Sequence, residues 1–160
     1  MNGYKGYRAQ GASENPDRGE VVLSLKTVQR MLPLVQRIMD DFLSGQKALV
    51  RLQPEERVLD RRKRTLDWPG RQRRYLLKEE IAVLENDLLG ARDELEVLGV
   101  VLLEPESGRV GFPTMVNNRR AFFSWQPSED GLHSWHFEEE TQCRPIPPAW
   151  LKEISVTASS

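Results

Sequence analysis

Both histidines of the chain lie in one short stretch, LHSWHFEEE, which runs from Leu132 to Glu140. Histidine and carboxylate side chains that lie close together can bind a metal ion or exchange protons near neutral pH. In a β-strand, however, side chains alternate between two faces, so His133 and His136 should point in opposite directions. The chain has one cysteine and no third histidine that could complete a zinc site. We therefore expect no metal site, no cofactor and no catalytic residue set.

A pocket on one face of the same strand is a second interpretation of this stretch. Glu138 shares a strand face with His136, and a neighbouring carboxylate can orient a histidine or raise its pKa. Such a site would suit a small anionic ligand. The candidate residues are Trp125, Trp135, His136, Glu138 and Arg144. The alternative is that both tryptophans are core aromatics and that His136 makes a local hydrogen bond, because aromatic residues of a small sheet mostly pack inside.

Charge separation along the chain indicates a further candidate site. The segment from Arg51 to Lys78 has ten Lys/Arg and four acidic residues, whereas the segment from Glu79 to Glu106 has nine acidic residues and one arginine. A basic segment can contact a polyanion such as a nucleic-acid backbone. The candidate contacts are Arg61, Arg62, Lys63, Arg64, Arg71, Arg73 and Arg74. The alternative is a solvated basic tip that pairs with acidic helix faces, within one chain or between two copies.

A helical pattern begins after Ser24, which is a typical N-cap residue. Apolar residues then recur in steps of three and four, as on one face of a helix: Leu25, Val28, Leu32, Val35, Met39 and Phe42. Pro33 lies inside this pattern and predicts a kink near Arg30, because proline removes one hydrogen bond of the helix. The pattern weakens at Ser44-Gly45, and Pro54 indicates that a helix starts again there.

The next helix gives the most regular pattern of the chain. We expect it to run from Gly70 to Leu98, a length of roughly 43 Å, and to stop at Gly99. Its apolar seam follows a heptad repeat: Leu77, Ile81, Leu84, Leu88, Ala91, Leu95 and Leu98. Two helices that each have an apolar seam, joined by a short break, predict an antiparallel hairpin. That hairpin would leave Val83 and Leu89 uncovered, so either the sheet or a second copy should cover them.

The composition changes after Gly99. Strands are predicted at residues 100–103, 110–112, 120–125 and 132–137, with turns at Pro105–Gly108, Asn117-Asn118 and Ser128–Gly131 between them. Short strands with such spacing are typical of an antiparallel meander. The predicted fold class is therefore α+β: a long antiparallel helical hairpin, kinked at Pro33, followed by a small antiparallel β-meander.

Length and composition favour one domain in a soluble chain. The chain has 160 residues and a net charge of −1, which predicts no general attraction to nucleic acid or membranes. We expect a disordered tail at 1–20, one α+β domain at 21–150 (the hairpin at 21–99, the sheet at 100–146) and a flexible tail at 151–160. No signal peptide or apolar run long enough to span a membrane is expected, so the predicted location is cytoplasmic. The lone Cys143 excludes a disulfide within the chain.

Several motifs, in order, resemble a bacterial family, domain of unknown function 2203 (DUF2203). They are LPLV (32–35), LGVVLLEPESGRVGFP (98–113), AFFSWQPSEDGLHSWH (121–136) and RPI (144–146). The resemblance covers roughly Val22 to Ile146 and implies a helical hairpin with a C-terminal sheet. It implies no activity. The chain departs from the family pattern at Phe137, where relatives usually have glutamate, and at Cys143, where they usually have glycine.

The long seam without a catalytic set favours a non-enzymatic scaffold or interaction protein. We expect it to self-associate through its heptad helices, as in a coiled coil, into a homodimer or larger homo-oligomer, and to bind an unidentified protein partner. The first alternative is the ligand or weak enzymatic pocket around Trp125, Trp135, His136 and Arg144. The second alternative is nucleic-acid binding by the basic hairpin tip.

Overall fold

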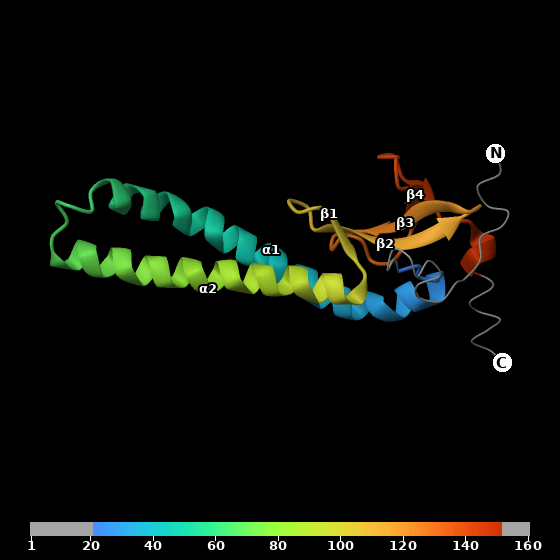
Figure 1. Ribbon diagram of the computed structural model, residues 1–160, viewed down its shortest axis with the longest axis horizontal. Coiled ribbons are helices and arrows are strands. Elements are labelled where there is room, and N and C mark those ends of the chain that lie inside the picture. The colour runs from blue at the N-terminus through green and yellow to red at the C-terminus, as the bar shows by residue number, and fades with distance from the viewer. Residues whose placement is uncertain (1–20, 152–160) are drawn as a thin grey trace.

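The computed structural model describes residues 21–151, and the tails predicted at 1–20 and 152–160 lie outside the described residues. Two long helices come first and a five-stranded antiparallel sheet follows. The sheet lies beside one end of the hairpin, and the other end projects away from it (Figure 1). The predicted α+β fold, a helical hairpin followed by a β-meander, is confirmed.

Helix α1 (Leu25–Arg61) is one helix of 37 residues with Pro33 and Pro54 inside it. Ser24 caps its start, because the serine hydroxyl accepts a hydrogen bond from the Thr27 amide at 3.1 Å. The predicted interruption at Ser44-Gly45 and restart at Pro54 are wrong. Gly45 packs closely on Leu88 of the other helix, and Leu49 and Leu52 continue the buried seam beyond it. This burial offsets the cost of about 3 kcal/mol that an interior proline imposes.

Helix α2 (Trp68–Leu98) begins two residues before the predicted start at Gly70. Asp67 is the N-cap, since its carboxylate accepts a hydrogen bond from the Gly70 amide at 2.9 Å. This cap and the proline in the first turn allow the helix to start at Trp68. The predicted stop is confirmed, because Gly99 adopts the left-handed conformation with φ of 79°.

The sheet is a simple meander in the order β1-β2-β3-β4-β5. Its strands are β1 (Val101–Glu104), β2 (Arg109–Val116), β3 (Arg119–Trp125), β4 (Ser134–Phe137) and β5 (Arg144–Pro145). The predicted turn at Asn117-Asn118 joins β2 to β3, with φ of 53° and 60° at the two asparagines. This conformation suits a two-residue hairpin. β5 was not predicted, because a two-residue strand has no periodicity of its own.

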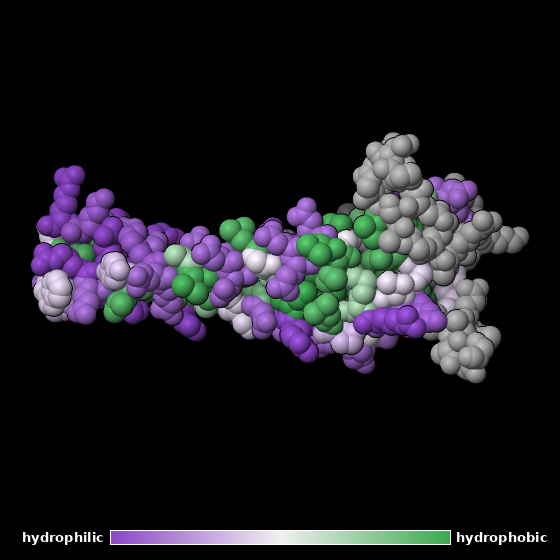
Figure 2. Space-filling model, turned by 60° about the horizontal axis from the view of Figure 1, so that its bottom comes forward, coloured by the Kyte–Doolittle hydropathy of each residue, from purple (hydrophilic) through white to green (hydrophobic). Residues whose placement is uncertain are grey.

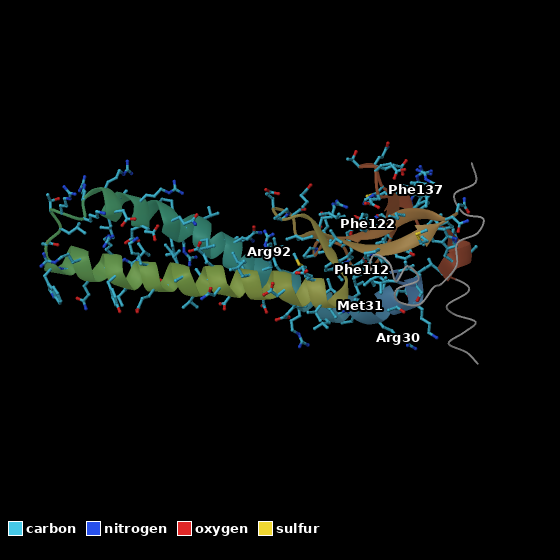
Figure 3. The ribbon with its side chains drawn as sticks, viewed as in Figure 1. Arg30, Met31, Arg92, Phe112, Phe122 and Phe137 are labelled. Atoms are coloured by element: carbon cyan, nitrogen blue, oxygen red, sulfur yellow. The ribbon has the colours of Figure 1, made fainter. Side chains whose placement is uncertain are left out.

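The apolar core divides into a large cluster and a small one. The large cluster joins the sheet and the base of the hairpin and includes Phe42, Phe112 and Trp135. The small cluster, which we call the distal cluster, holds the far part of the hairpin together through Leu49, Leu52, Leu77 and Ile81. Leu88 packs against both clusters. The labelled phenylalanines gather at the sheet end, whereas charged side chains surround the distal hairpin (Figure 3).

A short helical turn at residues 148–151 follows the sheet. Its Trp150 is buried against Trp135, with the ring centroids 5.6 Å apart. Leu151, predicted as the first residue of the tail, therefore belongs to the described structure. So short a helix has no periodic pattern by which it could be predicted.

Candidate functional site

The strand register places the residues of the predicted pocket on both faces of the sheet. Trp135 pairs with Phe123 and His136 pairs with Phe122, so the two neighbours point in opposite directions. Trp125 is two residues from Phe123 and shares its face. Trp125 and His136 therefore lie on opposite faces, and the five predicted residues do not form one cavity.

Both tryptophans belong to the core, which was the alternative interpretation. Trp125 and Trp135 have no exposed surface. Arg144 lies over Trp135, with the guanidinium carbon 5.3 Å from the ring centroid, and it pairs with Glu140 at 2.7 Å. The hydrogen bond from Arg144 lowers the pKa of the Glu140 carboxyl. Arg144 thus lies at the edge of the aromatic core, where its guanidinium packs on the Trp135 ring.

The two histidines have separate surroundings. His136 is 6% exposed, and its Nδ1 lies 2.8 Å from the Phe137 carbonyl oxygen, to which it can donate a hydrogen bond. His133 is exposed and lies 2.9 Å from Asp130, and this contact lowers the pKa of the Asp130 carboxyl. Within residues 21–151 no group of three His, Cys, Asp or Glu side chains is arranged to hold a metal ion.

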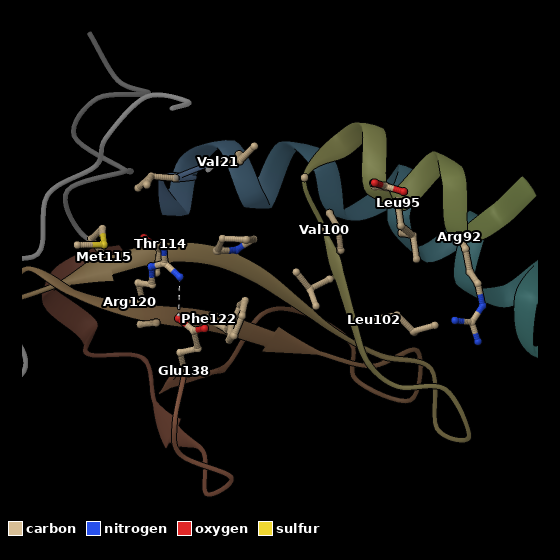
Figure 4. Close-up of a pocket in the computed structure, with 16 residues that line it drawn as sticks. Val21, Arg92, Leu95, Val100, Leu102, Thr114, Met115, Arg120, Phe122 and Glu138 are labelled. Atoms are coloured by element: carbon tan, nitrogen blue, oxygen red, sulfur yellow. Dashed lines mark ion pairs between the residues drawn. The ribbon is translucent and has the colours of Figure 1, made fainter. Parts of the chain in front are cut away.

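A cleft on the outer side of the sheet contains one of the predicted residues, Glu138. The cleft has a volume of about 540 Å³ and lies between the end of α2, the start of β1 and the first two residues of the described chain, Val21 and Val22. Arg120 and Phe122 also line it, and Figure 4 shows the ion pair between Arg120 and Glu138. Neither residue was predicted as part of a site, although their spacing of two places them on one strand face.

The cations of the predicted hairpin tip fall into two groups. Arg73 pairs with Glu55 at 2.6 Å and Arg74 pairs with Asp60 at 2.7 Å. These contacts lower the pKa of the Glu55 and Asp60 carboxyls, the first chiefly through the Arg73 hydrogen bond and the second through that of Arg74. The remaining candidates are exposed and make no ion pair among the described residues: Arg61, Arg62, Lys63, Arg64 and Arg71.

Helix α2 exposes many apolar side chains along its length. Val83 and Leu89 are each 59% exposed and Val97 is 86% exposed, so the sheet does not cover them. Three further large apolar residues, Trp68, Tyr75 and Leu76, are exposed nearer the tip. We call this surface the outer face of α2. Figure 2 shows apolar surface over the sheet end and isolated apolar residues on the otherwise hydrophilic distal hairpin.

The fold defines the class of this protein: an α+β domain in which a helical hairpin extends beyond a small antiparallel sheet. Residues 22–143 match the family described as uncharacterized conserved protein (DUF2203), and the chain belongs to that family. No curated protein and no solved structure matches the chain. No helix between residues 21 and 151 combines the length and apolar character that a membrane crossing requires.

Proposed function

We propose that this protein is a non-enzymatic interaction module that forms a homodimer through the outer face of α2. The observation that carries the proposal is the exposure of large apolar side chains at about every second turn of that helix. Apolar side chains that recur along a helix at heptad spacing are typical of a surface that packs against another helix. The tryptophans that could have formed a ligand pocket are buried in the core.

The spacing of these side chains suits packing against another helix. Trp68, Tyr75, Ala82 and Leu89 follow one another at intervals of seven residues, and so do Leu76, Val83, Gly90 and Val97. Each series forms a stripe along the helix, and the two stripes flank a polar row that contains Glu79, Asn86 and Asp93. A partner helix that lies along this polar row would cover both apolar stripes.

Charge favours an antiparallel arrangement of the two copies. Four of the five basic residues of α2 lie in its first eleven positions, and all seven of its acidic residues follow them. Parallel helices would bring like charges together, whereas antiparallel helices bring each basic start beside an acidic end. None of the seven carboxylates makes an ion pair among the described residues.

A twofold axis between Ala82 and Val83 gives complementary contacts. Antiparallel helices would then place Leu76 opposite the partner's Leu89, and Tyr75 opposite the partner's Gly90. A side chain added at Gly90 would meet nothing within 4 Å, so this position offers room for the tyrosine ring. On the flanks, Arg71 would lie opposite the partner's Glu94.

The expected affinity follows from the size of this surface. A helix of 31 residues is about 46 Å long and roughly 10 Å wide. It offers about half of the roughly 800 Å² per partner that a stable interface buries. We therefore expect a reversible dimer with a dissociation constant in the micromolar range.

Sedimentation equilibrium from low to high micromolar concentration tests the proposal. The wild-type chain should dimerise, and Val83→Glu should be monomeric because it places a charge at the centre of the interface. Val50→Glu is a matched control, since Val50 is an exposed valine on α1, and it should leave the dimer intact. A wild-type chain that stays monomeric at high micromolar concentration would refute the proposal.

Cross-linking tests the orientation of the helices. In a Cys143→Ser background, Leu76→Cys and Leu89→Cys chains should be joined by a short bismaleimide only when they are mixed. Efficient cross-linking of Leu76→Cys chains alone would instead indicate a parallel pair.

A further inference from the structure

We propose that the cleft beside β1 binds a small, uncharged and largely apolar molecule. The polar end of this molecule should carry both a hydrogen-bond donor and an acceptor, as a primary carboxamide does. This inference is independent of the proposed dimer, because no residue that lines the cleft belongs to the outer face of α2. We call the cavity the edge cleft.

The size and walls of the edge cleft suit an organic molecule. Its volume of about 540 Å³ lies within the range of about 300–1,000 Å³ that is usual for ligand pockets. Most of its lining is apolar, with Val21, Val101, Pro113, Met115 and Phe122 among the walls. An apolar ligand body would bury these surfaces, which favours binding.

A glycine allows an aromatic ring to lie across the sheet at this cleft. A Cβ atom at Gly111 would lie 2.8 Å from Phe122 Cδ1 and 2.9 Å from Leu103 Cδ1. The absence of a side chain therefore lets Phe122 and Leu103 cover the strand closely. The Phe122 ring also lies 5.7 Å from the His136 ring, so its position is supported from both sides.

The polar end of the edge cleft combines opposite charges. Arg120 Nη1 lies 3.6 Å from Glu138 Oε2, which is longer than a hydrogen bond. The Glu138 amide donates to the Arg120 carbonyl at 3.0 Å, so the backbone holds the two residues side by side. A guanidinium has five N–H donors and a carboxylate has several acceptor sites, so together they can bind a group that accepts and donates.

The charge balance of the lining determines the class of ligand. Among residues 21–151, the charged side chains of the lining are Arg92 and Arg120 against Glu96 and Glu138. An anionic or cationic ligand would therefore meet a like charge beside each opposite one, and it would lose hydration without a net attraction. A carboxamide meets Arg120 with its oxygen and Glu138 with its NH₂ group, and it brings no charge into the cleft.

A competition experiment on the wild-type full-length chain tests this inference. The probe is N-phenyl-1-naphthylamine, an uncharged aromatic amine whose fluorescence rises in apolar sites. Octanamide, octanoate and octylamine each have eight carbon atoms in a linear chain and differ in the head group. The concentration of octanamide that displaces the probe should be at least about tenfold lower than that of either charged analogue. This ratio corresponds to a difference of about 1.4 kcal/mol in binding free energy. Equal displacement by all three would overturn the proposal.

Variants locate the site and identify the polar residues. Val101→Trp should fill the edge cleft and abolish probe binding, whereas Val50→Trp, at an exposed valine of α1 outside the cleft, should not. Glu138→Gln should shift the preference toward octanoate, because Arg120 then meets an anion without a competing carboxylate. Circular dichroism confirms that each variant is folded.

Two results with folded variants would contradict the assignment. The first is probe binding that survives Val101→Trp. The second is probe binding that is lost on Val97→Ser, which would place the probe in the groove that Val97 forms with Leu34 and Ile38 on the hairpin.

Discussion

The distal part of the hairpin should depend on one buried leucine. Leu77 has no exposed surface, whereas its neighbour Leu76 is 50% exposed. Leu77→Ala removes three carbon atoms, which corresponds to about 2.4 kcal/mol of lost burial. The cavity left behind raises the expected cost to about 3–5 kcal/mol. Leu76→Ala makes the same chemical change at an exposed position and should cost less than about 1 kcal/mol in the monomer.

This loss should appear as local opening of the hairpin. The distal cluster has only four buried residues, and the ion pairs beside it are partly exposed to solvent, so they contribute little. Hydrogen exchange at low protein concentration should show faster exchange in Leu77→Ala around Leu49–Leu59 and Tyr75–Leu84, with the sheet still protected. Unchanged protection there, or equal loss of protection in the sheet, would refute this account of the distal cluster.

Two further predictions concern a turn and an ion pair. Asn118→Val should cost about 1–2 kcal/mol in urea unfolding, because a β-branched residue is strained at the φ of 60°, whereas Asn118→Gly should be nearly neutral. Hydrogen bonds from Arg74 and then Lys78 lower the pKa of the Asp60 carboxyl from 3.8. The charged carboxylate therefore stabilises the fold above about pH 4. This stabilisation is lost as the pH falls through the lower pKa of the folded state. Asp60→Asn should therefore lower the urea midpoint at pH 7, and the difference from the wild-type midpoint should shrink as the pH falls below about 4.

Local signals in the sequence predicted most of the fold. The two apolar seams identified the hairpin, because helical spacing of three and four brings apolar residues to one side. Ser24, Gly99 and Asn117-Asn118 were predicted correctly as a cap, a stop and a turn, since each depends on the conformation of a few neighbouring residues. The start of the second helix was misplaced by two residues, because Asp67 was not recognised as its cap.

Long-range packing produced the differences from the prediction. Proline and glycine favoured a break in the first helix, but burial of Leu49 and Leu52 against the second helix keeps it continuous. Burial of Trp150 against Phe123 and Trp135 holds a short helical turn that has no periodic signal. Such contacts join residues far apart in the chain, so no local sequence pattern predicts them.

The sequence by itself predicted that His133 and His136 lie on opposite faces of one strand, because alternation is a property of the strand alone. In the structure β4 begins at Ser134, so His133 lies before the strand and contacts Asp130. It also determined where charge and apolar residues recur along each helix. Only the tertiary structure decided which face of the sheet the hairpin covers, and this choice buried Trp125 and Trp135. The edge cleft likewise exists only after folding, since Val21, Val101, Arg120 and Glu138 meet there from four separate segments. A cavity depends on how elements pack, and the pattern within each element does not specify that packing.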